Sequence, residues 1–186
     1  MSKSKHSLAA EDWLDEALNV MATEGVKAIA VEPLAKRLGV TKGSFYWHFK
    51  NRDALITELL AFWERIELEY INDFNHKFPD PIQRLKAILE VLVDDETNKY
   101  IFLALANGVA DPMFDQAYRK AVIRRIQLFE NTLVTIGSTQ ALALVKAHKL
   151  YCQYFGLIKL AMDRPTDRLS DELYSLLKQD LLESFS

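Results

Sequence analysis

The segment from Val31 to Asp53 constrains the fold more than any other part of this chain. Its first part carries apolar residues spaced for one face of a short helix, namely Leu34, Ala35 and Leu38. Gly39 follows, and glycine readily adopts the positive φ that ends a helix in a tight turn. A second short helix is predicted from Lys42 to Phe49, with Thr41 as its N-cap. Two short helices joined by a tight turn predict a helix-turn-helix.

The second predicted helix has an inner and an outer side. Phe45 and Phe49 lie one helical turn apart, so both are expected to point into the core. The outer side then carries basic, hydroxyl and aromatic groups, and no acidic residue occurs between Pro33 and Arg52. Basic groups attract phosphates, while hydroxyls and aromatic rings suit contact with sugars, base edges and thymine methyls. The pattern favours contact with double-stranded DNA.

This stretch resembles the DNA-binding signature of the tetracycline-repressor (TetR) family of bacterial transcriptional regulators. The resemblance rests on L-A-K-R-L-G-V-T followed by K-G-S-F-Y-W-H-F-K-N-R-D-A-L, and it covers roughly the first third of the chain. It implies an N-terminal three-helix DNA-binding domain and a larger C-terminal helical domain for ligand binding and dimerisation. Matched position by position, it implies that the following residues contact DNA: Thr41, Lys42, Gly43, Ser44, Tyr46, Trp47, His48, Lys50 and Arg52.

The rest of the chain is also expected to be helical, because only 6 Gly and 5 Pro occur and no long alternating β pattern is present. The predicted fold class is therefore all-α. A long helix from Arg52 towards Lys77 would span roughly 40 Å and join two domains, expected at 1–51 and 52–186. Further helices are predicted at about 8–24, 81–93, 98–109, 112–136, 140–162 and 168–185.

The last two predicted helices carry more apolar surface than their own domain can easily cover. The TetR resemblance implies that they pair with a second copy of the chain, which gives a homodimer. Two recognition helices about 34 Å apart would then read a palindromic operator. The expected effector is an unidentified small molecule, with Cys152, Gln153 or His148 as polar contacts. Its pocket is expected among the aromatic residues Phe62, Trp63, Phe102, Tyr118, Phe129, Tyr151, Tyr154 and Phe155.

Other features exclude several classes of protein. The single cysteine, Cys152, excludes an intramolecular disulfide framework and is expected to be a buried, inert thiol in a cytoplasmic protein. No uncharged apolar run reaches the roughly 18 residues of a membrane span, so no membrane contact is expected. Four scattered histidines and the absence of catalytic motifs predict no catalytic residue, no metal and no cofactor.

The formal net charge of −3 does not contradict DNA binding, because the acidic residues of the first third lie mostly between Glu11 and Glu24. Two alternatives stay open. One is a helical protein-binding module whose basic segment docks an acidic partner. The other is a small-molecule carrier or enzyme with a vestigial helix-turn-helix.

Overall fold

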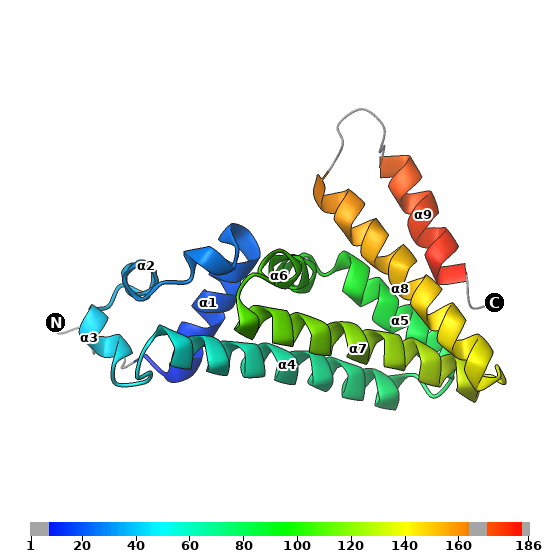
Figure 1. Cartoon of the computed structure of the whole chain (residues 1–186), viewed down its shortest axis with the longest axis horizontal. Coiled ribbons are helices and arrows are strands. Elements are labelled where there is room, and N and C mark those ends of the chain that lie inside the picture. Colours follow the sequence, from blue (N-terminus) through cyan, green and yellow to red (C-terminus); the bar gives the residue numbers. More distant parts are fainter. Residues whose placement is uncertain (1–7, 164–170, 184–186) are drawn as a thin grey trace. The chain divides into compact units, whose positions relative to one another are not determined.

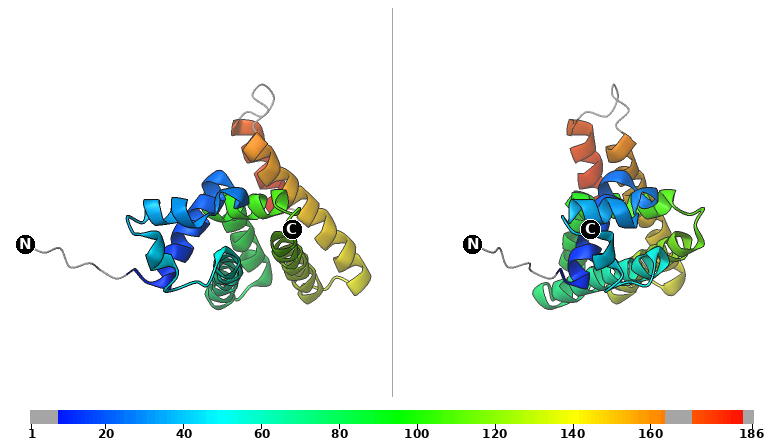
Figure 2. Two further views of the ribbon diagram at one scale, coloured as in Figure 1. Left: turned by 60° about the vertical axis from the view of Figure 1, so that its left-hand side comes forward. Right: turned by 90° about the vertical axis from the view of Figure 1, so that its left-hand side faces the viewer.

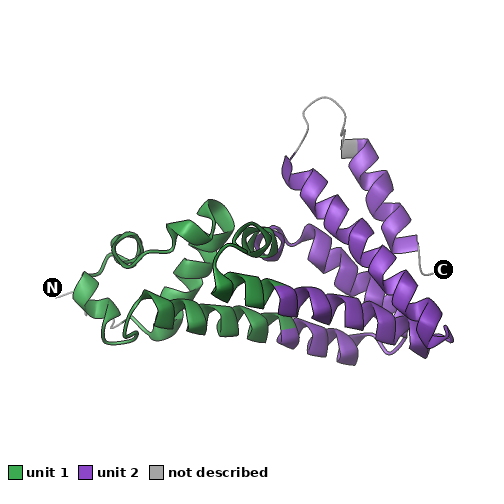
Figure 3. Cartoon of the chain, in the orientation of Figure 1, with its two compact units in different colours: residues 1–67, 100–118 green, residues 68–99, 119–186 purple. Residues whose placement is uncertain are grey.

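The fold of this chain is helical throughout the part that the structure describes. The computed structural model describes residues 8–163 and 171–183, and every regular element in those ranges is a helix (Figure 1). The all-α prediction is confirmed. The chain divides into two compact units (Figure 3). Unit 1 comprises Met1–Glu67 and Tyr100–Tyr118, and unit 2 comprises Leu68–Lys99 and Arg119–Ser186.

Unit 1 is built around an aromatic core. Trp13 is fully buried, and its ring lies edge-on to Phe45 at a centroid distance of 5.4 Å. The ring centroid of Phe49 also lies 5.4 Å from that of Phe45. The helical elements are α1 (Ala10–Glu24), the 3₁₀ helix η1 (Val26–Ala28), α2 (Val31–Arg37), α3 (Lys42–Phe45) and parts of α4 (Arg52–Lys77), α6 (Glu96–Asn107) and α7 (Pro112–Thr135).

The predicted domains, residues 1–51 and 52–186, stay a prediction, and the two compact units each contain part of α4. The first part of α4 belongs to unit 1, where it buries the apolar side chains Leu55, Ile56, Leu59 and Trp63. An ion pair of 3.3 Å between Arg65 and Glu11 also joins α4 to α1.

Most helix ends follow from local sequence signals. Gly39 has a φ of +67°, which confirms the predicted turn between α2 and α3. The side chain of Asn51 accepts the Ala54 N–H at 2.9 Å at the start of α4. Asp111 does the same for Met113 at the start of α7, also at 2.9 Å. These bonds satisfy N–H groups that a helix N-terminus leaves without partners.

Unit 2 contains α5 (Pro81–Asp94), α8 (Gln140–Asp163), α9 (Asp171–Glu183) and the remaining parts of α4, α6 and α7. Leu89, Phe129 and Tyr154 are fully buried in its core. Helices α8 and α9 lie side by side in all views (Figures 1 and 2). An ion pair of 2.5 Å between Lys178 and Asp94 joins α9 to α5. No helix within the described ranges has the length and apolar character that crossing a membrane requires.

We predict that Gly108→Ala destabilises unit 1 by about 1–3 kcal/mol, because the added methyl group overpacks its core. A Cβ at Gly108 would lie 2.9 Å from a methyl carbon of Val26 and 3.2 Å from the Ala104 carbonyl oxygen. The free energy of unfolding, measured by chemical denaturation, tests this. The matched control is Gly43→Ala, whose Cβ would meet only the Thr41 hydroxyl at 3.6 Å. Equal stability of the two variants would contradict the prediction.

Candidate nucleic-acid interface

Helices α2 and α3 pack against each other as a helix-turn-helix. Leu34 and Ala35 form the buried face of α2. After the Gly39 turn, the Val40 N–H donates to the Ala35 carbonyl at 3.0 Å and closes the end of α2. Thr41 occupies the N-cap position of α3 with extended backbone angles, but its side chain makes no capping hydrogen bond. The predicted arrangement of the two helices is confirmed.

The second helix is shorter than predicted. Regular α-helix ends at Phe45, and the residues from Tyr46 to His48 form turns instead of continuing to Phe49. The His48 N–H donates to the Phe45 carbonyl at 3.0 Å, a bond of the tighter 3₁₀ type. A run of aromatic residues and histidine has low helix propensity, which explains the early end. Phe45 and Phe49 still point inward as predicted, with 0% and 1% of their surfaces exposed.

The nine predicted DNA-contact residues all lie in unit 1 and close together along this segment. Tyr46 and Trp47 are the most distinctive, because 56% and 87% of their surfaces are exposed. Large aromatic side chains exposed to this extent commonly mark binding surfaces. The remaining residues are exposed (Thr41, Lys42, Gly43 and Lys50) or half-buried (Ser44, His48 and Arg52).

Two arginines of the segment are committed to contacts within unit 1. Arg37 pairs with Glu16 at 3.4 Å and also with Glu24, and both carboxylates come from α1. Arg52 donates its Nε–H to the Ile29 carbonyl at 2.7 Å. Arg37 therefore holds α2 to α1, and Arg52 holds the start of α4 to the connector before α2. A phosphate contact by Arg52 stays a prediction, and the guanidinium has further N–H groups for it.

Lys42, one of the predicted DNA-contact residues, has an acidic partner that was not among the predicted site residues. Its Nζ lies 2.8 Å from Oε1 of Glu32, and both side chains are exposed. The hydrogen bond from Lys42, reinforced by its positive charge, lowers the pKa of Glu32 below 4.5. The same hydrogen bond and the negative charge of Glu32 raise the pKa of Lys42 above 10.5. Both groups stay charged across the neutral range. The available signal was that Glu32 is the single acidic residue from Val31 to Arg52.

Gly43 is not required by the local backbone. Its φ is not positive, and a Cβ there would make only an ordinary contact of 3.6 Å with Thr41. The surface at this position is exposed. A glycine that neither the fold nor the packing requires is consistent with close approach of another molecule to the backbone.

The predicted effector-pocket residues are divided between the two units. Phe62, Trp63, Phe102 and Tyr118 belong to unit 1, whereas Phe129, Tyr151, Tyr154 and Phe155 belong to unit 2. In unit 1, the Phe102 and Tyr118 rings are 5.4 Å apart. In unit 2, Tyr151 stacks on Phe155 at 6.0 Å, and the Arg125 guanidinium lies 5.8 Å from the Tyr154 ring. Their role in binding a ligand stays a prediction.

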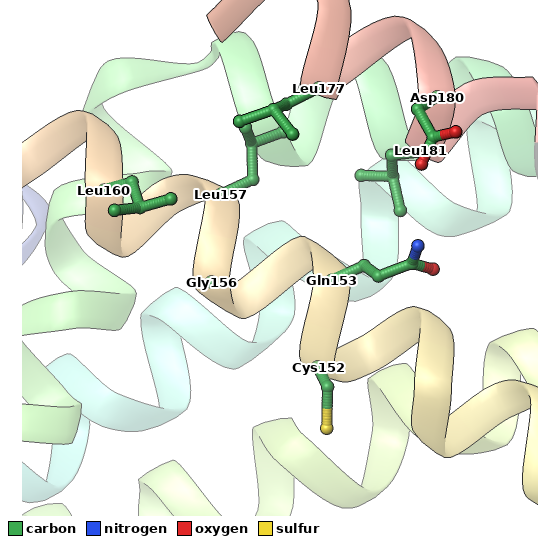
Figure 4. Close-up of a pocket in the computed structure, with 8 residues that line it drawn as sticks. All are labelled: Cys152, Gln153, Gly156, Leu157, Leu160, Leu177, Asp180 and Leu181. Carbon is green, nitrogen blue, oxygen red and sulfur yellow. The ribbon is translucent and has the colours of Figure 1, made fainter. Parts of the chain in front are cut away.

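A shallow pocket of about 180 Å³ lies between α8 and α9 (Figure 4). None of the predicted aromatic residues lines it, but Cys152 and Gln153 do, together with Gly156, Leu157, Leu160, Leu177, Asp180 and Leu181. The expectation of a buried Cys152 was wrong, because the thiol is exposed on this side of α8. Within the described residues, no cluster of three or more His, Cys, Asp or Glu side chains could hold a metal ion.

Residues 14–59 match the family model described as "Bacterial regulatory proteins, tetR family". The chain is also 40% identical over 81 residues to the HTH-type transcriptional regulator AcrR of Shigella flexneri. That alignment covers 41% of this chain and 36% of AcrR. The similarity in sequence therefore spans only about a third of that relative.

Two solved structures share the fold over almost the whole chain. A Rhodococcus transcriptional regulator has a TM-score of 0.74 at 22% identity and covers 94% of both chains. A Saccharomonospora viridis protein, crystallised in complex with choline, has a TM-score of 0.77 at 17% identity and covers 92% of both chains. At these identities the likeness concerns the fold alone.

We predict that Trp47→Ala changes the free energy of unfolding by less than about 0.5 kcal/mol, because its side chain contributes little to the core. The contrasting variant, Phe45→Ala, should lose about 3–5 kcal/mol, because it removes a fully buried aromatic ring. Denaturation monitored by circular dichroism measures both values. A large loss in Trp47→Ala would mean that this residue is structural, and it would remove the main support for an exposed binding surface.

Proposed function

Because this chain belongs to the TetR family of bacterial regulatory proteins, we propose that it is a ligand-responsive transcriptional regulator that binds DNA. We propose further that it acts as a repressor, released from a palindromic operator by a small molecule. The observation that carries DNA binding is the exposure of Tyr46 and Trp47 beside basic side chains, on a segment anchored by buried Phe45. A surface of this composition suits a sugar-phosphate backbone and base edges.

The nine interface residues have distinct proposed roles. Lys42 donates to a base edge or a phosphate, and Gly43 lets the backbone approach the duplex. Tyr46 and Trp47 contact sugars or thymine methyls. Hydroxyl, imidazole and cationic groups hold phosphates: these are Thr41, Ser44, His48, Lys50 and Arg52.

A small-molecule effector is proposed for the helical part that follows the DNA-binding segment. The aromatic groups around Phe102 and Tyr154 support an effector with a planar or apolar part. The choline complex of the Saccharomonospora protein supports the idea that a chain of this fold can hold a small molecule. Helix α4 offers a route for coupling, because it begins at Arg52 in the DNA-binding segment and ends at Lys77 in unit 2. A shift of this helix would change DNA affinity.

A homodimer formed through α8 and α9 is the proposed assembly. On α9, Leu181 is buried, whereas Leu173, Leu176 and Leu177 are 38–56% exposed. The three exposed leucines follow the i, i+3, i+4 spacing of a single helix face. Exposed apolar residues also occur on α8, including Leu160 and Met162. A face of this kind is stabilised by pairing with its own copy about a two-fold axis.

The remaining proposals concern location and alternatives. A cytoplasmic location agrees with a free, exposed thiol at Cys152, which a reducing compartment preserves. No observation favours a carrier, an enzyme or a protein-docking module over DNA binding. The exposed tryptophan and the family match both support the regulator.

Selection of bound duplexes from genomic fragments tests DNA binding directly. We expect enrichment of a duplex with two related half-sites about 34 Å apart, because a two-fold dimer presents two recognition helices. Its affinity should fall steeply with salt concentration, since phosphate contacts release counterions. Absence of any enriched duplex over bulk competitor DNA would overturn the proposal.

We predict that Lys42→Ala weakens binding to the selected duplex by about tenfold or more, because a specific contact to a base or phosphate is lost. Fluorescence anisotropy at moderate salt measures the dissociation constant. The matched control is Lys27→Ala, which removes an exposed lysine from η1 in the same unit. The assignment of Lys42 would be wrong if both variants bound equally well.

We predict that Leu176→Glu converts the dimer to monomers, because a carboxylate in an apolar interface loses its hydration without gaining a partner. The fold should persist, since 56% of the Leu176 surface is exposed. Analytical ultracentrifugation at several protein concentrations measures the mass and hence the dissociation constant of the dimer. We expect this constant to increase by about tenfold or more. The control, Gln83→Glu, adds the same charge at an exposed position of α5. An unchanged dimer in Leu176→Glu would exclude this face as the interface.

A further inference from the structure

We propose that Glu32 is a specificity-determining residue of the DNA interface. It holds the ammonium group of Lys42 and opposes the transfer of that group to the nearest phosphate. This inference rests on the proposed DNA-binding function. The proposed DNA interface would then include one negatively charged residue beside its cations and aromatic rings. The role is one of positioning, because Glu32 acts through Lys42.

The ion pair links the N-terminal turns of the two helices. Glu32 lies in the first turn of α2, and Lys42 is the first residue of α3. Their side chains meet at 2.8 Å between Nζ and Oε1, although ten residues separate them. Both side chains are exposed, at 52% for Lys42 and 73% for Glu32. A duplex docked on α3 would therefore encounter the pair and not Lys42 alone.

An ammonium group has three N–H donors, and one is committed to Glu32. Lys42 can keep this bond and still donate another N–H to a base acceptor such as guanine O6 or N7. Binding of the Lys42 ammonium group to a phosphate is different. The anionic phosphate oxygen competes with the Glu32 carboxylate for the ammonium group, and the two negative groups are brought close together. The carboxylate therefore penalises the phosphate-bound arrangement more than the base-bound one.

The other cations of the segment make this restriction selective for Lys42. Arg37 is neutralised by Glu16 and Glu24 on α1. Lys36 and Lys50 are exposed, and neither forms an ion pair with any residue that the structure describes. They can bind phosphates of any sequence, which supports affinity without specificity. Lys42 is the single cation of α3, and a carboxylate limits the reach of its ammonium group.

The charges of the pair persist under ordinary binding conditions. Its mutual interaction keeps the pKa of Glu32 below 4.5 and that of Lys42 above 10.5. The effect of Glu32 on DNA specificity is thus present above the ordinary pKa of a glutamate. It is lost as the pH falls through the lowered pKa of Glu32. The effect of Lys42 on DNA binding is present below the ordinary pKa of a lysine. It is lost as the pH rises through the raised pKa of Lys42. Neither transition falls near neutral pH, so the proposed effect is constant there.

The test compares Glu32→Gln with the wild-type full-length chain on two duplexes. One is the duplex selected from genomic fragments, and the other is a scrambled duplex of equal length. We expect affinity for the scrambled duplex to rise about fivefold, because Lys42 gains one phosphate contact, and the salt slope to steepen by about 0.9. Affinity for the selected duplex should change by less than about twofold, so the ratio of the two affinities falls.

The control Glu58→Gln makes the same change of charge at an exposed residue of α4. If Glu32→Gln and Glu58→Gln alter the two affinities equally, a general charge effect explains the result and the inference is overturned. In a Lys42→Ala background, Glu32→Gln should no longer change the affinity ratio, as a double-mutant cycle shows. A persistent change there would also overturn it. Failure of the wild-type chain to prefer the selected duplex would instead refute the proposed function.

Discussion

The position of the DNA-binding surface depends on the burial of Phe45 among the aromatic rings of unit 1. Its ring centroid lies 5.4 Å from those of both Trp13 and Phe49. Helix α3 spans only Lys42–Phe45, too short to be stable through its own hydrogen bonds. Burial of one such side chain contributes about 2–3 kcal/mol, comparable with several exposed contacts. The aromatic anchor, more than helix formation, therefore fixes the direction in which Trp47 is presented to solvent.

Charge pairing determines which cations of this surface are available to a polyanion. Arg37 pairs with carboxylates of α1, and Arg52 donates one N–H to a backbone carbonyl, so the first is committed to the scaffold and the second only in part. Lys36 and Lys50 extend into solvent, whereas Lys42 forms an ion pair with Glu32. A net-acidic chain can therefore present a locally cationic surface, because opposite charges cancel where they hold helices together.

Features encoded by neighbouring residues were predictable, whereas features set by tertiary packing were not. The turn at Gly39 and the cap at Asn51 follow from glycine φ preferences and side-chain capping, which need only a few residues. The inward direction of Phe45 follows from helical periodicity. The exposure of Cys152 depends instead on which side of α8 the other helices cover, and periodicity of a nearly all-apolar helix carries no such information. The pairing of Lys42 with Glu32 similarly requires the angle between α2 and α3.

The exposed apolar side chains of Trp47 and Leu176 differ in their surroundings, and that difference indicates different partners. Trp47 lies in the sequence between Lys42 and Lys50, and the single acidic residue from Val31 to Arg52 is Glu32, which is paired with Lys42. Leu176 is accompanied on α9 by both acidic and basic side chains, among them Asp180 and Lys178. Phosphates would be repelled by the acidic side chains of the second surface, but a copy of the chain can place opposite charges together around a two-fold axis. Aromatic groups among cations suit a nucleic acid, and leucines among mixed charges suit a protein.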